Sequence, residues 1–215
     1  MQLLGAIIVK LVIQIPCYNE YDYLPITIGD LPRTISGIDE IEVLVIDDGS
    51  TDDTAQLARE LGVHHIVRFA HNRGLSAAYM AGLDACMRLG ADIVVNTDAD
   101  NQYKGADIEK LVEPILKGRT DIVIGDRQTD TIPHFSPIKR ILQRWGSRLV
   151  QRASGTRVVD STSGFRAMSR KTISALFVHN QFTYTLETII QAGKLGLAIE
   201  NVKISCNENY KFDLC

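Results

Sequence analysis

The hydrophobic positions of this chain cluster in five short runs that are rich in Val and Ile. The runs lie at residues 9–15, 41–47, 64–69, 91–97 and 121–126. Runs of this length, bounded by polar or glycine-containing segments, are typical of buried β-strands. Between them, apolar side chains recur at helical spacing near residues 51–62, 74–89 and 105–118. This alternation predicts an α/β fold with a mostly parallel central sheet flanked by helices.

The composition indicates one folded unit. The 215 residues are 45% hydrophobic and 23% charged, enough for one well-filled core and short for two. No repeat or low-complexity linker marks a boundary, so we expect a single domain over residues 1–215. The apolar stretch at residues 3–15 contains Lys10 and is too short to span a bilayer, so it predicts the first strand. Four widely spaced cysteines predict reduced thiols and a cytosolic protein.

Polar loops follow three of the predicted strands. They read "PCYNE" at residues 16–20, "DDGSTDD" at residues 47–53 and "TDADNQ" at residues 97–102. Ligands of open α/β sheets bind at the carboxyl ends of the strands, so we expect the site where these loops meet. If the chain stays extended beyond the fourth strand, Asp98, Asp100 and Gln102 would project to one side of it.

Two carboxylates and an amide oxygen are hard ligands that suit Mg²⁺ or Mn²⁺. The chain has neither GxGxxG after its first strand nor GxxxxGK[ST], so bound phosphates would need another partner. A metal-bound nucleotide diphosphate fits these constraints, because Mg²⁺ typically combines one or two carboxylates with substrate phosphates. For the "DAD" segment alone, an ordinary acidic turn remains the alternative.

The neighbouring loops carry further polar residues. Ser50, with Asp53 three residues later, predicts a cap for the following helix. Asp47 and Asp48 are not needed for that cap, and an acid there could accept hydrogen bonds from a base or from ribose hydroxyls. Arg73 precedes a predicted helix, whose free backbone donors favour an anion. These features favour a nucleotide at the site.

Six segments occur in order between Val12 and Glu200. They are "IPCYNE", "VIDDGSTDDT", "NRGLSAAYMAGL", "TDADNQY", "GDR" and "DSTSGFRAMSR". Together they resemble the inverting family 2 glycosyltransferases of the GT-A fold, in the branch similar to dolichyl-phosphate mannose synthases and bacterial polyprenyl-phosphate hexose synthases. The resemblance implies a metal-dependent enzyme, with Mg²⁺ or Mn²⁺, that moves a hexose from a GDP- or UDP-sugar to a polyprenyl phosphate.

The resemblance also implies roles for individual residues. The nucleotide would be bound by Pro16, Tyr18, Glu20, Asp47, Asp48, Arg73 and Asp98. The metal would be held by Asp98, Asp100 and Gln102. The lipid phosphate would be bound by Arg127 and Arg140, so that Asp98, Asp100, Arg127 and Arg140 carry the chemistry.

Basic residues concentrate in one segment of the chain. Residues 127–171 contain ten Lys or Arg and two acids, a net charge of +8, whereas the other 170 residues contain 13 bases and 24 acids, a net charge of −11. Within it, residues 136–155 present an apolar stripe with Trp145 and an arginine every fourth residue. Such a helix could lie in an anionic membrane surface at the cytosolic face, or pack its apolar stripe on the core. Nucleic acid is a poor partner, because the rest of the molecule is acidic.

The acceptor decides whether a catalytic base is needed. A phosphate monoester has a second pKa of about 6 and is largely dianionic at neutral pH, so it attacks without a base. A sugar hydroxyl would need a carboxylate, for which Asp160 and Glu187 are candidates. Arg166 could serve the site or pair within the fold.

The C-terminal sequence departs from the resembled pattern. After Glu200, relatives usually show a proline and a basic, serine-rich run, whereas this sequence reads "ENVKISCNENYKFDLC". The expected consequences are an altered acceptor side or a naturally short or truncated chain. Transfer to a hydroxyl acceptor and an inactive nucleotide-sugar-binding module are therefore the alternatives. The sugar, the base, the lipid length and the oligomeric state are not specified by the sequence.

Overall fold

The computed structural model describes residues 8–128, 146, 149–179 and 184–207. Its seven-stranded sheet has the order β3-β2-β1-β4-β6-β5-β7. The strands are β1 (Lys10–Cys17), β2 (Glu40–Asp47), β3 (His65–Arg68), β4 (Ile93–Asn96), β5 (Ile122–Asp126), β6 (Arg166–Ser169) and β7 (Ile199–Lys203). Only β6 runs antiparallel to its neighbours β4 and β5, and the other pairs in the described residues are parallel. The predicted mostly parallel sheet is therefore confirmed.

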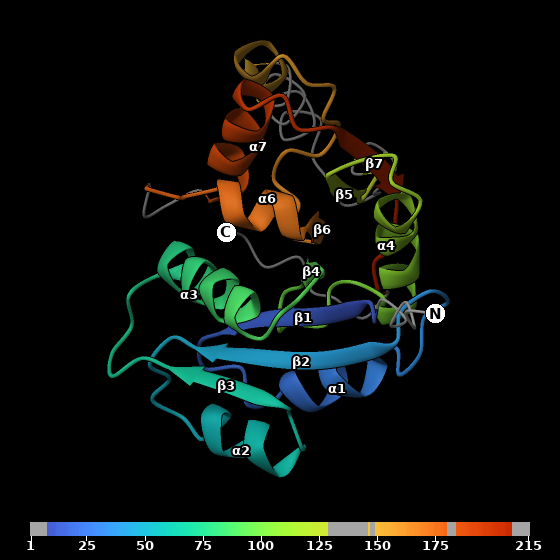
Figure 1. Cartoon of the computed structure of the whole chain (residues 1–215). Helices are drawn as coiled ribbons and strands as arrows, with labels where there is room; N and C mark the ends of the chain where they lie inside the picture. Colours follow the sequence, from blue (N-terminus) through green and yellow to red (C-terminus); the bar gives the residue numbers. More distant parts are fainter. Residues whose placement is uncertain (1–7, 129–145, 147–148, 180–183, 208–215) are drawn as a thin grey trace.

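Helices cover both faces of the sheet. They are α1 (Leu24–Asp30), α2 (Thr54–Glu60), α3 (Leu75–Arg88), η1 (Gly105–Asp107), α4 (Ile108–Leu116), α6 (Arg170–Ala175) and α7 (Tyr184–Lys194). Side chains of α1, α2 and α4 join one core cluster, and those of α3, α6 and α7 join the other. Figure 1 shows α1 and α2 on the side of β1–β3 opposite to α3.

The central strand β1 explains why the first apolar run is continuous. Leu11, Ile13 and Ile15 belong to one core cluster and Val12 to the other, and all four are fully buried. A strand covered on both faces selects apolar residues at successive positions rather than at alternate ones. Because β1 lies between β2 and β4, their carboxyl ends meet at one edge of the sheet.

All five predicted strands are present as β1 to β5, but the predicted cap of α2 is wrong. The helix begins at Thr54, and its backbone N–H donates to Asp52 Oδ1 over 3.0 Å. Ser50 Oγ accepts instead from the backbone N–H of Asn19, 3.0 Å away. The Ser50 hydroxyl therefore joins the loop after β2 to the loop after β1, because the fold brings Asn19 within hydrogen-bond distance.

The helix predicted at residues 136–155 falls mostly outside the described residues, as do Arg140 and Trp145. Residues 149–154 are helical, with Leu149 exposed and Val150 buried. The membrane and core interpretations of this segment both remain predictions. In the part of the chain that the structure describes, no helix is long and apolar enough to cross a membrane.

Candidate active site

The loops that follow β1 and β2 are joined by hydrogen bonds at the carboxyl edge of the sheet. The backbone N–H of Glu20 donates to Thr54 Oγ1 over 3.0 Å, and that of Thr51 donates to Asn19 Oδ1 over 2.8 Å. Asn19 has φ 57°, a left-handed conformation that Asn tolerates better than most residues. The first polar loop is therefore fixed by the second, as the predicted meeting of the loops requires.

Glu20 brings the first loop to the acids of the third. Burial is the main cause that raises the pKa of the half-buried Glu20 to about 7, and the charges of Asp100, Asp98 and Asp52 raise it further. Among the described residues, no positively charged side chain counteracts this rise in the pKa of Glu20. The residues fit a divalent cation, because an added positive charge at this point would favour the ionised carboxylates.

This environment predicts a pH-dependent stability for the metal-free protein. Because the pKa of Glu20 is above its usual value of 4.5, the folded state binds its proton more tightly than the unfolded state does. Stability should therefore fall as pH rises from about 4.5 to 7, and Glu20→Gln should remove part of this fall. Urea unfolding at a series of pH values measures it, and an identical pH profile in Glu20→Gln would contradict the prediction.

Asp98 lies at the centre of the same acidic group. Burial and the neighbouring Asp100 raise the pKa of Asp98 to about 6, while the charges of Arg127 and Arg166 and a hydrogen bond from Tyr103 oppose the rise. The structure thus brings together Glu20 from the loop after β1, Asp98 and Asp100 from the loop after β4, and Arg127 at the end of β5. Among the described residues, no three Asp, Glu, His or Cys side chains form a complete metal centre. A cation held by Asp98 and Asp100 would use substrate oxygens for its other positions.

The acids converge by a turn and not by the strand alternation that we expected. β4 ends at Asn96, and Asn101 has φ 57°, so the extension does not persist through residue 102. Asp100 Oδ1 accepts a hydrogen bond of 3.0 Å from the backbone N–H of Gln102. Carboxylates commonly form such local turns, which compete with continued strand structure. Gln102 itself is buried, and its role as a metal ligand stays a prediction.

A glycine from another part of the chain makes space for Asp98. A Cβ atom at Gly164 would lie 2.9 and 3.0 Å from the carboxylate oxygens of Asp98 and 3.0 Å from the hydroxyl oxygen of Tyr184. Asn96 holds this loop in place, since its side-chain amide donates to Gly164 O over 2.9 Å and accepts from Gln14 over 2.9 Å. Sequence reasoning missed these residues, although Gln14 and Asn96 are polar positions within apolar strands.

Gly164→Ala is therefore expected to push the Asp98 carboxylate out of position. We expect Mn²⁺ binding measured in the presence of UDP or GDP to weaken about tenfold or more, because contacts of about 3 Å force a short side chain to move. Gly29→Ala in α1 is the matched control, because a Cβ there meets nothing within 4 Å. Equal metal affinity in both variants would contradict the assignment.

Arg127 is fixed by an acid on a distant loop. Its Nε and one Nη donate to the two oxygens of Asp160 over 2.7 and 3.0 Å, and the same Nη donates to Thr162 Oγ1 over 2.7 Å. Burial opposes ionisation of Asp160, but the hydrogen bonds and charge of Arg127 hold its pKa below the usual value. A carboxylate with a lowered pKa is a weak base, so this geometry disfavours Asp160 as a general base.

The guanidinium of Arg166 is buried and bound to other parts of the fold. The side chain is 1% exposed and donates to Ser163 O, Ser161 O, Thr185 O and Thr188 Oγ1 over 2.7–2.9 Å. These bonds tie the loop before β6 to the start of α7. Of its two interpretations, the structure favours pairing within the fold.

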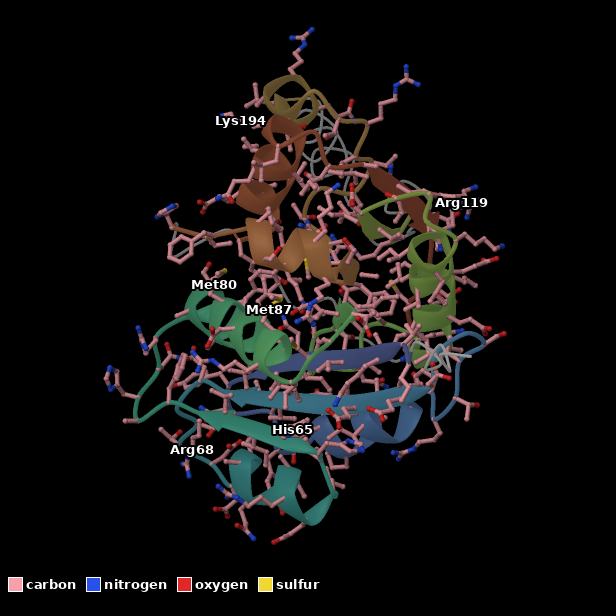
Figure 2. The ribbon with its side chains drawn as sticks, in the orientation of Figure 1. His65, Arg68, Met80, Met87, Arg119 and Lys194 are labelled. Carbon is pink, nitrogen blue, oxygen red and sulfur yellow. The ribbon has the colours of Figure 1, made fainter. Side chains whose placement is uncertain are left out.

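The two acids at the end of β2 already have protein partners. Asp48 accepts from the backbone N–H groups of Arg73 and Gly74 over 2.7 and 2.9 Å, which fixes the start of α3. Asp47 accepts from Ser50 N over 3.0 Å, and its other oxygen lies 2.9 Å from Nε of Arg68 at the end of β3, labelled in Figure 2. The nucleotide contacts of Asp47 and Asp48 stay predictions. The contact that the structure shows for Asp48 is with the backbone at the start of α3.

The remaining predicted nucleotide residues differ in exposure. Pro16 is buried within β1, whereas Tyr18 follows the strand and is 45% exposed. The Arg73 guanidinium lies 4.9 Å from the centre of the Phe69 ring, a cation–π distance. Tyr18 is thus two residues from Glu20, whereas the Arg73 guanidinium lies on the side of β3 and the Arg73 backbone N–H binds Asp48. Arg140 falls outside the described residues.

Known proteins of one family are similar to this chain. Residues 12–177 match the model of the family described as glycosyl transferase family 2. The polyprenol monophosphomannose synthase of Mycolicibacterium smegmatis is 29% identical over 205 residues, covering 90% of this chain and 76% of that protein. The undecaprenyl-phosphate mannosyltransferase of Micrococcus luteus is 29% identical over 201 residues, covering 89% and 81%.

A solved structure extends the likeness to the fold. The glucosyl-3-phosphoglycerate synthase from Mycobacterium tuberculosis, in complex with Mn²⁺, UDP-glucose and phosphoglyceric acid, has a TM-score of 0.74 and 23% sequence identity. The alignment covers 94% of this chain and 73% of that one. The sheet described above is thus a GT-A-like fold. Because the family model spans most of the chain and includes all three polar loops, the chain belongs to glycosyl transferase family 2.

Proposed function

We propose that the chain transfers a hexose from a nucleotide diphosphate sugar to a polyprenyl phosphate at the cytosolic face of a membrane, with Mg²⁺ or Mn²⁺. The observation that supports it most is the convergence of Asp98 and Asp100 beside the fixed guanidinium of Arg127. The relatives named above act, by their names, on polyprenol or undecaprenyl phosphate. The base of the donor, GDP or UDP, is left open.

The donor side of the proposed site uses carboxylates. Asp98 and Asp100 would hold the cation, which supplies positive charge against the negative charge that grows on the leaving diphosphate. Glu20 and Tyr18 lie at the adjacent edge, where the base and ribose are assigned. Burial strengthens these interactions, because a charge is screened less inside the protein than in water.

The acceptor side uses Arg127. Its Nε and one Nη donate to Asp160, so the other Nη would donate its two protons to an acceptor phosphate. Asp160 fixes the plane of the guanidinium, which lowers the entropy lost when a phosphate binds. A phosphate dianion attacks without losing a proton, and this agrees with a site in which Asp160 is held as a weak base.

Transfer to a hydroxyl acceptor is the second candidate. It would rely on a carboxylate base, and Glu187 accepts from the backbone N–H of His179 and from Gln191 over 3.0 Å each. Asp160, whose pKa is lowered by Arg127, is therefore not arranged as a base, and these contacts of Glu187 lie on α7 and the segment before it. These contacts favour the phosphate acceptor.

A turnover assay tests the proposal. GDP-mannose, UDP-glucose and UDP-N-acetylglucosamine would each be incubated with the protein, Mn²⁺ and a short polyprenyl phosphate, with the corresponding polyprenol as control. We expect transfer from one donor to the phosphate and none to the alcohol. Transfer to the alcohol would favour the second candidate, and nucleotide binding without any turnover would favour an inactive binding module.

A further inference from the structure

The residues that follow β7 lie against the loop that carries the acids. We call residues 204–207 the strap. Ile204 N donates to Asp126 O over 3.0 Å, and Ser205 N donates to Asp107 Oδ2 over 2.6 Å. Cys206 forms an antiparallel bridge with Tyr103. The strap therefore connects the end of β5, next to Arg127, with the loop that follows Asp100.

Asn207 makes the most concentrated contact of the strap. Its backbone N–H donates to Gln102 O over 2.9 Å, and its side-chain Nδ2 donates to Asn101 O over 2.9 Å and to Tyr103 O over 3.4 Å. One residue thus binds three successive carbonyl groups. These carbonyls directly follow Asp100, whose carboxylate is proposed to hold the metal.

The loop needs such external support because it contains an unsatisfied polar group at a turn. Asn101 has φ 57°, which Asn tolerates, but among the described residues its buried side-chain Oδ1 has no hydrogen-bond partner. A buried polar group without a partner persists only where the surrounding structure holds it in place. The carboxylate of Asp100 depends on the same backbone, because its Oδ1 accepts from Gln102 N over 3.0 Å.

We propose that Asn207 is a positioning residue for Asp100 and that it sets the affinity of the site for the divalent cation. This inference rests on the proposed function, in which Asp98 and Asp100 bind that cation. Asn207 would act through the backbone of residues 101–103 and would touch neither donor nor acceptor. Asn207, which lies where the sequence departs from the resembled family, would then support the donor site.

Two substitutions of Asn207 separate its side-chain donors from its volume. Asn207→Ala removes the side chain beyond Cβ, and Asn207→Asp keeps the shape but replaces the donor by an oxygen that faces two carbonyls. Ser205→Ala is the matched control, because Ser205 contacts the loop through its backbone. Mn²⁺ binding is measured by electron paramagnetic resonance with UDP and with GDP. We expect about 10–100-fold weaker binding in both Asn207 variants, as for other groups that orient a metal ligand, and little change in Ser205→Ala.

Hydrogen exchange of the metal-free proteins tests the positioning role without any metal. We expect the amides of residues 100–104 to exchange faster in Asn207→Ala than in the parent, and transfer at saturating Mn²⁺ to return to the parental rate. Unchanged exchange and unchanged Mn²⁺ affinity would overturn the inference. A rate deficit that persists at saturating Mn²⁺ would also overturn it, by indicating direct contact with substrate.

The same measurements separate this inference from the proposed function. If the parent protein binds no Mn²⁺ with either nucleotide, the proposed function fails, and the link between Asn207 and the metal is overturned with it, whatever the exchange rates. If the parent binds Mn²⁺ and Asn207→Ala binds it equally well, only the role of Asn207 fails.

Discussion

Asp100→Ala is expected to weaken Mn²⁺-dependent binding of UDP or GDP more than about hundredfold, while the circular dichroism spectrum stays that of the parent. Loss of a residue that merely orients a metal ligand weakens metal binding about 10–100-fold, and loss of a ligand should exceed that. Asp100 is partly exposed and lies in a turn, so its removal leaves both core clusters intact.

A second readout follows from the charge of Asp100. Because that charge raises the pKa of Asp98, the pKa of Asp98 should fall below its present value of about 6 in the variant. Asp84→Ala is the control, since Asp84 is an exposed acid that pairs with Arg88 on α3. Nucleotide binding that is equally tight with and without EDTA in the parent would contradict the metal assignment.

Loss of Arg127 is expected to have the second large effect. In Arg127→Met the Asp160 carboxylate, which is 3% exposed, loses its bidentate partner. Removing one member of a buried ion pair typically destabilises a protein by about 3 to 5 kcal/mol. Urea unfolding measures this, and Lys171→Ala, which breaks the exposed pair with Asp121, should cost less than about 1 kcal/mol.

The Arg127–Asp160 pair also has a pH signature. The pKa of Asp160 lies below its usual value of 3.8 in the folded state, so the pair stabilises the protein fully above about pH 4. This contribution is lost as pH falls through the folded pKa. In Asp160→Asn, the free energy of unfolding should therefore depend less on pH below about pH 4 than in the parent. The same pH dependence in both proteins would contradict a stabilising contribution of the pair.

Arg127→Lys separates the two substrates. It keeps a positive charge but loses the planar donor set, so use of a polyprenyl phosphate should fall about ten- to hundredfold, at about 1.5 to 3 kcal/mol for a charge-assisted hydrogen bond. The affinity for the nucleotide should stay near the parental value, because the donor residues lie on other loops. Equal losses for donor and acceptor would argue against this division.

The strand pattern predicted the first half of the fold better than the second. β1 to β5 were found because each is a local apolar run, and β1 is buried on both faces. β6 was missed because its four residues begin with Arg166, a charged side chain that is buried and donates to the carbonyl groups of Ser161 and of Thr185 on α7. The sequence pattern of these four residues does not indicate that Arg166 would bind Thr185 and Thr188 on α7.

The sequence by itself determined the alternating fold, the three polar strand-end loops and membership of the glycosyltransferase family, because strand runs and loop motifs are local patterns. Only the tertiary structure decided which polar groups meet. Arg127 reaches Asp160 across 33 positions, Asn96 reaches Gly164 across 68 and Asn207 reaches Asn101 across 106. Such pairs depend on the order of the strands in the sheet, and this order cannot be predicted from the residues next to each partner in the sequence. The turn at Asn101 was likewise decided there, since its left-handed backbone is held by contacts from the strap.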